Sequence, residues 1–191
     1  MHLSKLGYHA DFFVYPVLIA TAALRSLWQA PPQAAGCWFT ALAVGLLAWT
    51  ALEYALHRWV LHRVPPFRRL HALHHEHPVA LIGTPTWLSA PLFLSLWAVL
   101  AHEASAPTAN GMATGLMVGY IAYGFVHDAV HHRLSRRGSW LHRAKERHAR
   151  HHRAGSMTDF GVSTGLWDRV FGTRSLPVQR HAGAVPAERR T

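Results

Sequence analysis

The sequence predicts an all-α membrane protein with four transmembrane helices, arranged as two hairpins, and a histidine-rich helical cap on the cytoplasmic side. Three observations lead to this prediction. Half of the 191 residues are hydrophobic and only 15% are charged, and the apolar residues gather into four blocks. Lysine and arginine are confined almost entirely to alternate connections between those blocks. Seventeen histidines are present, and most of them form short clusters beside the second and fourth blocks.

The four apolar blocks are expected to be helices that cross the bilayer. A spanning helix needs roughly 20 apolar residues, so the first three blocks are long enough and the fourth is short. Strands would have to close into a barrel and would show strict alternation, which these blocks lack. Pro85 is expected to begin the third span, and Pro91 to kink it. The predicted spans cover residues 12–30, 37–56, 81–101 and 111–126.

The basic residues predict the orientation of these spans. Residues 31–36 and 102–110 contain no lysine or arginine, whereas four arginines separate the second and third blocks and thirteen basic residues follow the fourth. Because lysine and arginine concentrate in cytoplasmic loops, both termini and the central loop are expected in the cytoplasm. Arg25 lies inside the first block and is expected to snorkel or to face the bundle.

The rest of the composition predicts one domain at a lipid surface. Residues 1–176 are expected to form a single membrane domain, with a retained first span, and residues 177–191 a disordered tail. The net charge of +10 suits anionic lipid, and no nucleic-acid partner is expected because the apolar blocks contradict a soluble basic fold. With Cys37 as the only cysteine, no internal disulfide can form.

The histidines form four clusters with spacings that suit metal binding. On a helix, positions three and four apart share a face, so an HxxHH element presents three imidazoles together. His57 and His62 are five apart and diverge on an ideal helix, so they bind different metals or the helix ends between them. The clusters are HRWVLH (57–62), HALHH (71–75), HDAVHH (127–132) and HARHH (148–152).

So many histidines predict two metal ions rather than one. Structural zinc takes four ligands and favours cysteine, and about ten histidines are too many for one tetrahedral site. Imidazole suits zinc, copper, iron and nickel. Neutral ligands leave the metal charge uncompensated, so Glu53, Glu76 and Asp128 are candidates for carboxylates behind the ligands. Alternatively, Glu53 pairs with Arg58, and Asp128 caps a helix or pairs with Arg133.

In this order, the four clusters resemble the histidine boxes of the fatty acid hydroxylase and sterol desaturase superfamily. Residues 159–173 resemble the segment after the last box, and the resemblance spans residues 53–173. Gly161, Trp167 and Asp168 in that segment are expected to pack beneath the metal site in a structural role. Carried over motif by motif, the resemblance implies these metal ligands: His57, His62, His71, His74, His75, His127, His131, His148, His151 and His152.

The resemblance also implies an activity and its cofactors. Family members are integral membrane enzymes with a non-haem di-iron centre, which use dioxygen and external electrons to hydroxylate or desaturate lipids. We therefore expect an oxidoreductase that hydroxylates a fatty acyl or related lipid from the bilayer. Two iron ions are the expected cofactors, zinc is a possible substitute in purified protein, and dioxygen is the co-substrate. Electrons are expected from a separate ferredoxin or cytochrome, since the sequence shows no fused haem domain.

Several alternatives stay open at this point. The third box, if it is H-x3-H as in lipid 2-hydroxylases, has His131 as its ligand. If it is H-x4-H, as in bacterial carotenoid ring hydroxylases, the ligand is His132. Residues 159–173 favour the fatty acid hydroxylase interpretation. A carotenoid ring hydroxylase and a lipid desaturase are the alternatives within enzymes, and a metal-binding or metal-transport membrane protein is the alternative outside them.

Overall fold

The computed structural model describes residues 2–29, 34–153 and 155–175. Within this part of the chain every regular element is a helix, and the only β-type pairing is an isolated bridge between His2 and Ile82. The predicted all-α class is therefore confirmed. The predicted disordered tail, residues 177–191, lies outside the described residues.

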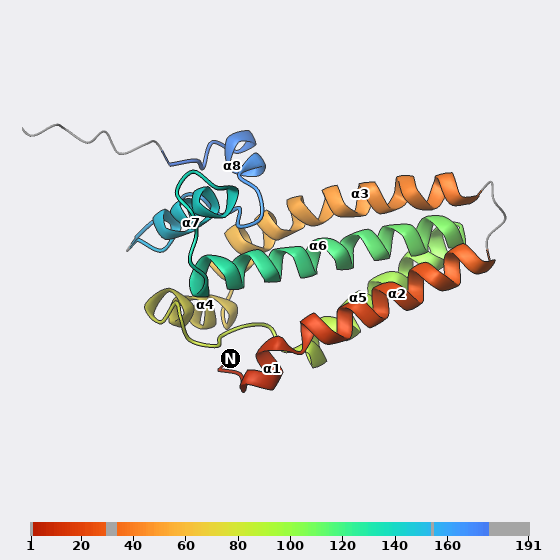
Figure 1. Ribbon diagram of the computed structural model, residues 1–191, viewed down its shortest axis with the longest axis horizontal. Coiled ribbons are helices and arrows are strands. Elements are labelled where there is room, and N and C mark those ends of the chain that lie inside the picture. The colour runs from red at the N-terminus through yellow and green to blue at the C-terminus, as the bar shows by residue number, and fades with distance from the viewer. Residues whose placement is uncertain (1, 30–33, 154, 176–191) are drawn as a thin grey trace, which may run out of the picture.

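Four long helices lie along one another and form the body of the molecule (Figure 1). They coincide with the four predicted apolar blocks, with two differences. The third begins directly after Pro85, the residue expected to begin it, which occupies its N-cap in an extended conformation, so the helix starts later than the predicted block boundary at residue 81. The fourth extends well beyond the predicted 111–126 in both directions and carries the third histidine cluster on its last turns. The four helices are α2 (Asp11–Gln29), α3 (Ala34–Ala55), α5 (Thr86–Glu103) and α6 (Ala106–His132).

Helices α3 and α6 pack backbone against backbone through glycines. A Cβ on Gly115 would lie 2.9 Å from the Leu46 nitrogen, and a Cβ on Gly119 would lie 2.5 Å from that of Trp49. Only hydrogen fits at these positions, so the two helix axes can approach closely along much of their length. This contact holds the end of α3, which continues into the histidine-bearing residues 56–62, beside the histidine-bearing end of α6.

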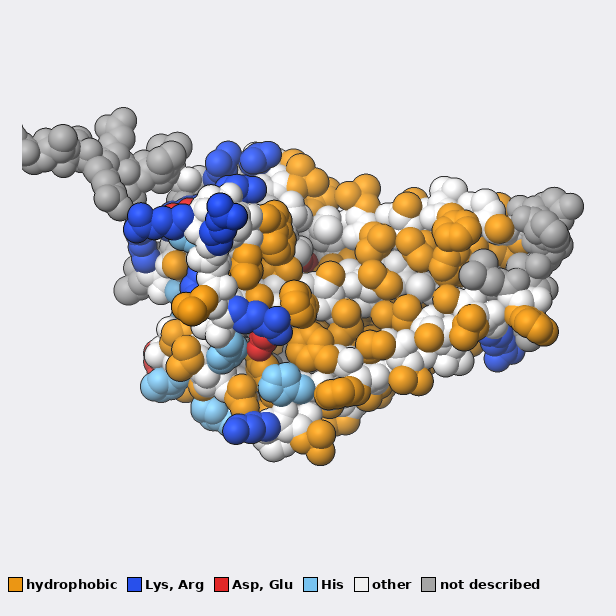
Figure 2. Space-filling model, in the orientation of Figure 1, with side chains coloured by type: hydrophobic (Ala, Val, Ile, Leu, Met, Phe, Trp, Pro, Cys, Tyr) orange, Lys and Arg blue, Asp and Glu red, His pale blue; other side chains and the backbone are white. Residues whose placement is uncertain are grey.

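The short helices gather at one end of the long ones (Figure 1). Figure 2 shows lysine, arginine and histidine side chains concentrated at that end, while hydrophobic side chains cover the long helices. Large apolar side chains such as Phe13, Phe39 and Trp87 are exposed there. The short elements are α1 (Lys5–His9), the π-helix η1 (Leu56–Leu61), α4 (Phe67–Glu76), α7 (Trp140–His151) and α8 (Leu166–Val170).

Among the described helices, one continuous segment has both the length and the apolar composition needed to cross a membrane. This is α3 together with η1, residues Ala34–Leu61. The other three long helices do not satisfy both criteria.

The chain after α7 folds back onto the end of α3. The indole nitrogen of Trp167 donates to the Thr50 hydroxyl at 3.0 Å. The Tyr54 and Thr173 hydroxyls are 2.9 Å apart, and the Phe171 ring stacks on Tyr54 with centroids 5.2 Å apart. These contacts place residues 158–163 directly against the histidine clusters.

Candidate metal centre

The structure brings all ten predicted histidines to one end of the bundle, and nine of them form two adjacent groups. Within each group, every candidate ligand nitrogen lies within 4.8 Å of the others. We call these the first cluster and the second cluster. The first cluster is His57, His62, His71, His75 and His151, and the second is His74, His131, His148 and His152.

His127 lies beside the second cluster without meeting the same distance limit. Its ring centroid is 4.7 Å from that of His74 and 5.0 Å from that of His148. It therefore lies close enough to complete the second cluster with a fifth imidazole.

The π-helix η1 explains how His57 and His62 come together. In a π-helix the N–H of residue i+5 bonds to the carbonyl of residue i, so residues five apart lie one turn apart. Their ring centroids are 5.3 Å apart, and both contact His151. The expected divergence on an ideal α-helix does not occur, because the helix changes its winding over this box.

Each HxxHH element divides its histidines between the two clusters. On α4, His71 and His75 are four apart and face the first cluster, whereas His74 faces the second. On α7 the division is reversed, because the pair four apart, His148 and His152, belongs to the second cluster. Neighbouring positions on a helix are turned by about 100°, so one element can serve two adjacent sites.

The nitrogens of the first cluster converge in a way that hydrogen bonds alone do not explain. The His71 Nε2 lies 3.0 Å from that of His57, 3.1 Å from that of His62 and 3.0 Å from that of His75. A neutral imidazole has one hydrogen, so Nε2 of His71 can donate at most once. A cation shared by these lone pairs satisfies them all, so the donor set fits a metal ion.

The second cluster also fits a metal ion, because several of its ring nitrogens are buried and unpaired within the described part of the chain. Both ring nitrogens of His74 and of His152 are buried without a hydrogen-bond partner among the described residues, as is Nδ1 of His148. Buried polar atoms are normally paired, and unpaired ones point to a ligand or ion. Imidazole nitrogens of this kind suit a borderline metal such as iron or zinc.

Burial keeps these rings in the form that binds metal. It lowers the pKa of His74 and of His152 to about 3, with neighbouring histidines adding to the effect. Burial likewise lowers the pKa of His75 and of His151 to about 4. The rings are therefore neutral near pH 7, and each retains a lone pair for a metal.

Two rings of the first cluster are oriented by backbone carbonyl groups. Nδ1–H of His57 donates to the Phe160 carbonyl at 2.5 Å, and Nδ1–H of His151 donates to the Thr158 carbonyl at 2.9 Å. A carbonyl can only accept, so both rings carry their hydrogen on Nδ1. Nε2 of each ring is left as a free lone pair that faces the cluster.

At the third box, His131 and His132 occupy different surroundings. Nε2 of His131 lies 2.8 Å from that of His148, inside the second cluster. His132 is exposed, and its ring approaches Tyr8 edge-on at 6.3 Å. The geometry therefore favours the H-x3-H interpretation of this box, in which His131 faces the cluster, over H-x4-H.

The three carboxylates predicted to lie behind the ligands make no hydrogen bond to a histidine in the described part of the chain. Glu53 accepts from the backbone N–H groups of Val162 and Ser163, at 2.7 and 2.9 Å. Asp128 lies 3.5 Å from the Arg133 guanidinium, as its alternative interpretation proposed. Glu76 is exposed on α4.

The groups behind the ligands that sequence reasoning missed are the Thr158 and Phe160 carbonyls and the side chains that hold them. A backbone carbonyl has no sequence signature, so only the resemblance of residues 159–173 could have pointed to this region.

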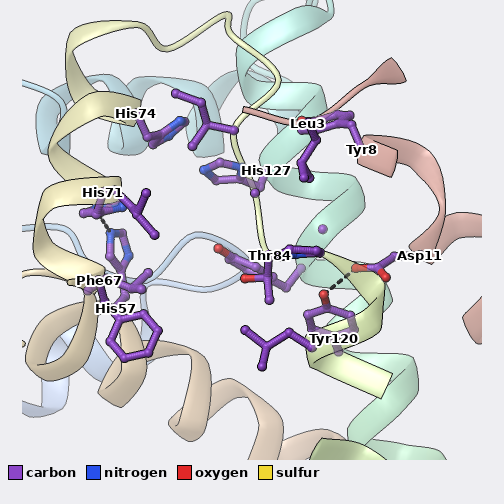
Figure 3. A pocket seen from close by; sticks show the side chains of 18 of the residues that line it. Leu3, Tyr8, Asp11, His57, Phe67, His71, His74, Thr84, Tyr120 and His127 are labelled. Carbon is purple, nitrogen blue, oxygen red and sulfur yellow. Dashed lines mark hydrogen bonds between the residues drawn. The ribbon is translucent and has the colours of Figure 1, made fainter. Parts of the chain in front are cut away.

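A cavity of about 220 Å³ opens beside the clusters (Figure 3). His57, His71, His74 and His127 form part of its wall, and most of the remaining wall is apolar. Across the cavity the Tyr120 hydroxyl donates to Asp11, which also accepts from Thr86 at 2.5 Å. Other lining residues include Leu3, Phe12, Leu61, Phe67, Leu88 and Ile121.

The sequence profile of a family described as fatty acid hydroxylase matches residues 42–173, which include all four histidine boxes. The chain belongs to the fatty acid hydroxylase family. The profile match begins at residue 42. Residues 2–12, which supply part of the cavity wall, therefore lie outside the matched region.

Similar proteins include hydroxylases from plants and mammals. The dihydroceramide fatty acyl 2-hydroxylase FAH2 of Arabidopsis thaliana is 34% identical over 142 residues, 69% of this chain and 59% of that protein. The fatty acid 2-hydroxylase of Mus musculus is 30% identical over 151 residues, 72% of this chain and 40% of that protein. This chain thus spans less than two thirds of the length of either relative.

A solved structure of full-length scs7p, in which only the hydroxylase domain is visible, has the same fold. It aligns with a TM-score of 0.76 over 92% of this chain and 71% of that one, at 22% identity. This chain and that hydroxylase domain therefore share the same arrangement of helices.

Proposed function

We propose that this protein is a membrane oxidoreductase that hydroxylates a C–H bond of a fatty acyl chain, using dioxygen at a centre of two iron ions. The observation that carries the proposal is the convergence of two histidine clusters on the wall of a largely apolar cavity. The family and the names of the similar proteins, which are fatty acyl and ceramide hydroxylases, support it.

The two clusters would each hold one ion. The first ion would bind His57, His62, His71, His75 and His151, and the second His74, His127, His131, His148 and His152. Iron is proposed because zinc has no redox chemistry, although zinc fits the same imidazoles in purified protein. When bound, the iron pair supplies the activation of dioxygen and the oxidising power needed to break an unactivated C–H bond.

The protein's own residues bind and orient the substrate. Apolar side chains such as Phe12, Leu88 and Ile121 give the acyl chain a wall without competing polar groups. The same walls exclude water from the reacting carbon, which limits side reactions. The carbonyl-anchored rings of His57 and His151 keep their Nε2 atoms directed at the cluster.

We also propose that the four long helices cross the membrane as two hairpins, with the short helices forming a cytoplasmic cap. The exposed apolar side chains on the long helices and the basic residues at the histidine-bearing end support this placement. The acyl substrate would then reach the cavity from the bilayer.

Electrons would come from a separate ferredoxin or cytochrome. Exposed basic residues at the histidine-bearing end, including Arg137 and Arg143, offer a surface for an acidic carrier. A metal transporter is disfavoured, because it would carry ligands along a path through the bundle, and here they gather at one end.

The test uses the full chain expressed in bacteria with added iron. Elemental analysis of the purified protein should find close to two metal ions per chain, and fewer in His151→Ala. Mass spectrometry of lipids from the same cells should find a hydroxylated acyl chain that is absent with the variant. A hydroxylated carotenoid, in cells that make carotenoids, would indicate the ring hydroxylase instead, and a new double bond would indicate a desaturase. One ion or none in folded protein would contradict the two-metal centre.

A further inference from the structure

In the described part of the chain, the turn formed by residues 158–163 hydrogen-bonds to histidines of one cluster and not of the other. Its Thr158 and Phe160 carbonyls accept from His151 and His57, which both belong to the first cluster. Asp159, between them, has φ +55°, the only positive φ at a non-glycine residue in the described chain. Aspartate tolerates this left-handed conformation better than most residues. The conformation places both flanking carbonyls against the cluster.

Buried carboxylates hold this turn in place. Asp168, which is fully buried, accepts from the N–H groups of Phe160 and Gly161 at 2.8 and 2.9 Å. Glu53, from α3, accepts from those of Val162 and Ser163. A Cβ on Gly161 would lie 2.9 Å from an Asp168 oxygen, so the turn leaves no room for a larger residue. The four successive N–H groups of residues 160–163 are thus bonded to carboxylates that, among the described residues, make no hydrogen bond to a histidine.

Arginines of α7 complete the support on the other side of the turn. Arg147 donates to the Gly161 and Val162 carbonyls at 2.9 and 2.7 Å. Arg150 donates to the Asp159 carboxylate at 3.1 Å. Since α7 also carries His151, the turn and this ligand are held by the same helix.

Among the described residues, no comparable hydrogen bonds from the backbone support the second cluster. Nδ1 of His148 and both ring nitrogens of His74 and His152 are buried without hydrogen-bond partners among the described residues. A ring whose second nitrogen is unbonded can rotate or change tautomer, and it must be ordered when it binds a metal. Partners that fix a ligating ring typically change metal affinity by about 10–100-fold.

We infer that the two metal sites are unequal: the 158–163 turn preorganises the first cluster, which holds its ion more tightly, and the second cluster releases its ion first. Asp168 is the positioning residue of this arrangement, because it accepts from the N–H groups of Phe160 and Gly161, which flank the Phe160 carbonyl in the chain. The inference rests on the proposed two-metal centre.

The experiment measures metal release from the full chain in detergent after loading with Co²⁺. Visible absorption of bound Co²⁺ reports ligand geometry, and elemental analysis counts the ions that remain during incubation with a chelator. We expect two phases of about one ion each, with the slow phase roughly tenfold slower or more. His148→Ala should remove the fast phase, and His151→Ala the slow one.

The role of Asp168 is tested by Asp168→Asn, which keeps one acceptor and loses the other. The slow phase should accelerate by about 10–100-fold, the fast phase should not change, and the Co²⁺ spectrum should change accordingly. Trp167→Phe is the matched control, because it removes a contact of the same segment to Thr50 and leaves the turn intact. If Asp168→Asn does not fold, Ser163→Ala removes one bond to Glu53 and should accelerate the slow phase more modestly.

Three results would overturn the inference. These are two ions leaving in a single phase, a slow phase that disappears in His148→Ala, and an Asp168→Asn variant in which both phases accelerate equally. Failure to load two ions would contradict the proposed metal centre instead, so the two failures are distinguishable.

Discussion

His57 and His62 are five positions apart in the chain, yet their rings lie together in the first cluster with centroids 5.3 Å apart. The π-helix η1 produces this relationship, because its hydrogen bonds join residues five apart. Because of this winding, one short box supplies two imidazole rings to the same cluster.

Insertion of one alanine after Val60 should disrupt the first cluster selectively. The extra residue turns His62 by about 100° relative to His57 and removes it from the site. Elemental analysis should then find the loss of about one ion per chain, with the second cluster still loaded. A glycine inserted beside Gly138, an exposed turn residue with no atom near its Cβ position, should leave the metal content unchanged. Full metal content in the Val60 insertion would contradict the assignment of His62 to this site.

Gly115→Ala should destabilise the bundle by about 1–3 kcal/mol, because its Cβ would meet the backbone of α3. Thermal or denaturant unfolding in a fixed detergent measures the effect. Gly36→Ala is the matched control, since nothing lies within 4 Å of its Cβ position in the same helix pair. That change should be neutral or stabilising by roughly 0.5–1 kcal/mol, because alanine favours helix more than glycine does. Equal effects of the two substitutions would contradict the close approach of α3 and α6.

Gly124→Leu should reduce lipid hydroxylation by about tenfold or more without loss of metal, because its side chain would fill part of the cavity. Gly124→Ala is the graded control, since its Cβ would make only an ordinary contact, 3.8 Å from the Phe12 ring. Product analysis and metal content are measured on the same preparations. Undiminished turnover of long acyl chains in Gly124→Leu would show that substrate binds elsewhere.

The metal-free protein should lose stability as the pH falls below about 6.5, the ordinary pKa of histidine in an unfolded chain. Burial lowers the pKa of His74 to about 3 and that of His75 to about 4 in the folded state. Between about pH 6.5 and these lowered pKa values, the unfolded state binds more protons than the folded state. The free energy of unfolding therefore decreases as the pH decreases.

Thermal unfolding of the metal-free protein at about pH 7.5 and about pH 5 checks this sign. His74→Gln should weaken the pH dependence, because one such ring is then absent. An unfolding temperature that stays constant or rises toward acid pH would contradict the burial of neutral rings.

Much of this protein could be predicted from local patterns. The four apolar blocks predict the four long helices, because residue hydrophobicity over a window of 20 residues reports helices that face an apolar environment. Of the three imidazoles that each HxxHH element is predicted to present together, only the pair four residues apart converges, as helical geometry requires, and the third joins the other cluster. The third box follows the same rule: His127 and His131 lie four apart on α6, and their ring centroids are 4.8 Å apart.

Tertiary contacts decide the features that no local rule contains. The split of His71 and His74 between two clusters depends on where α6 and α7 lie against α4, and the winding of η1 departs from the ideal helix on which spacing arguments rest. The carbonyls of Thr158 and Phe160 reach His151 and His57 from a turn that Glu53 and Asp168 bond from other parts of the chain, and a backbone carbonyl is present at every residue of any chain. Residue type therefore identifies which atoms can bind a metal, whereas packing determines which of them share one and how firmly each is held.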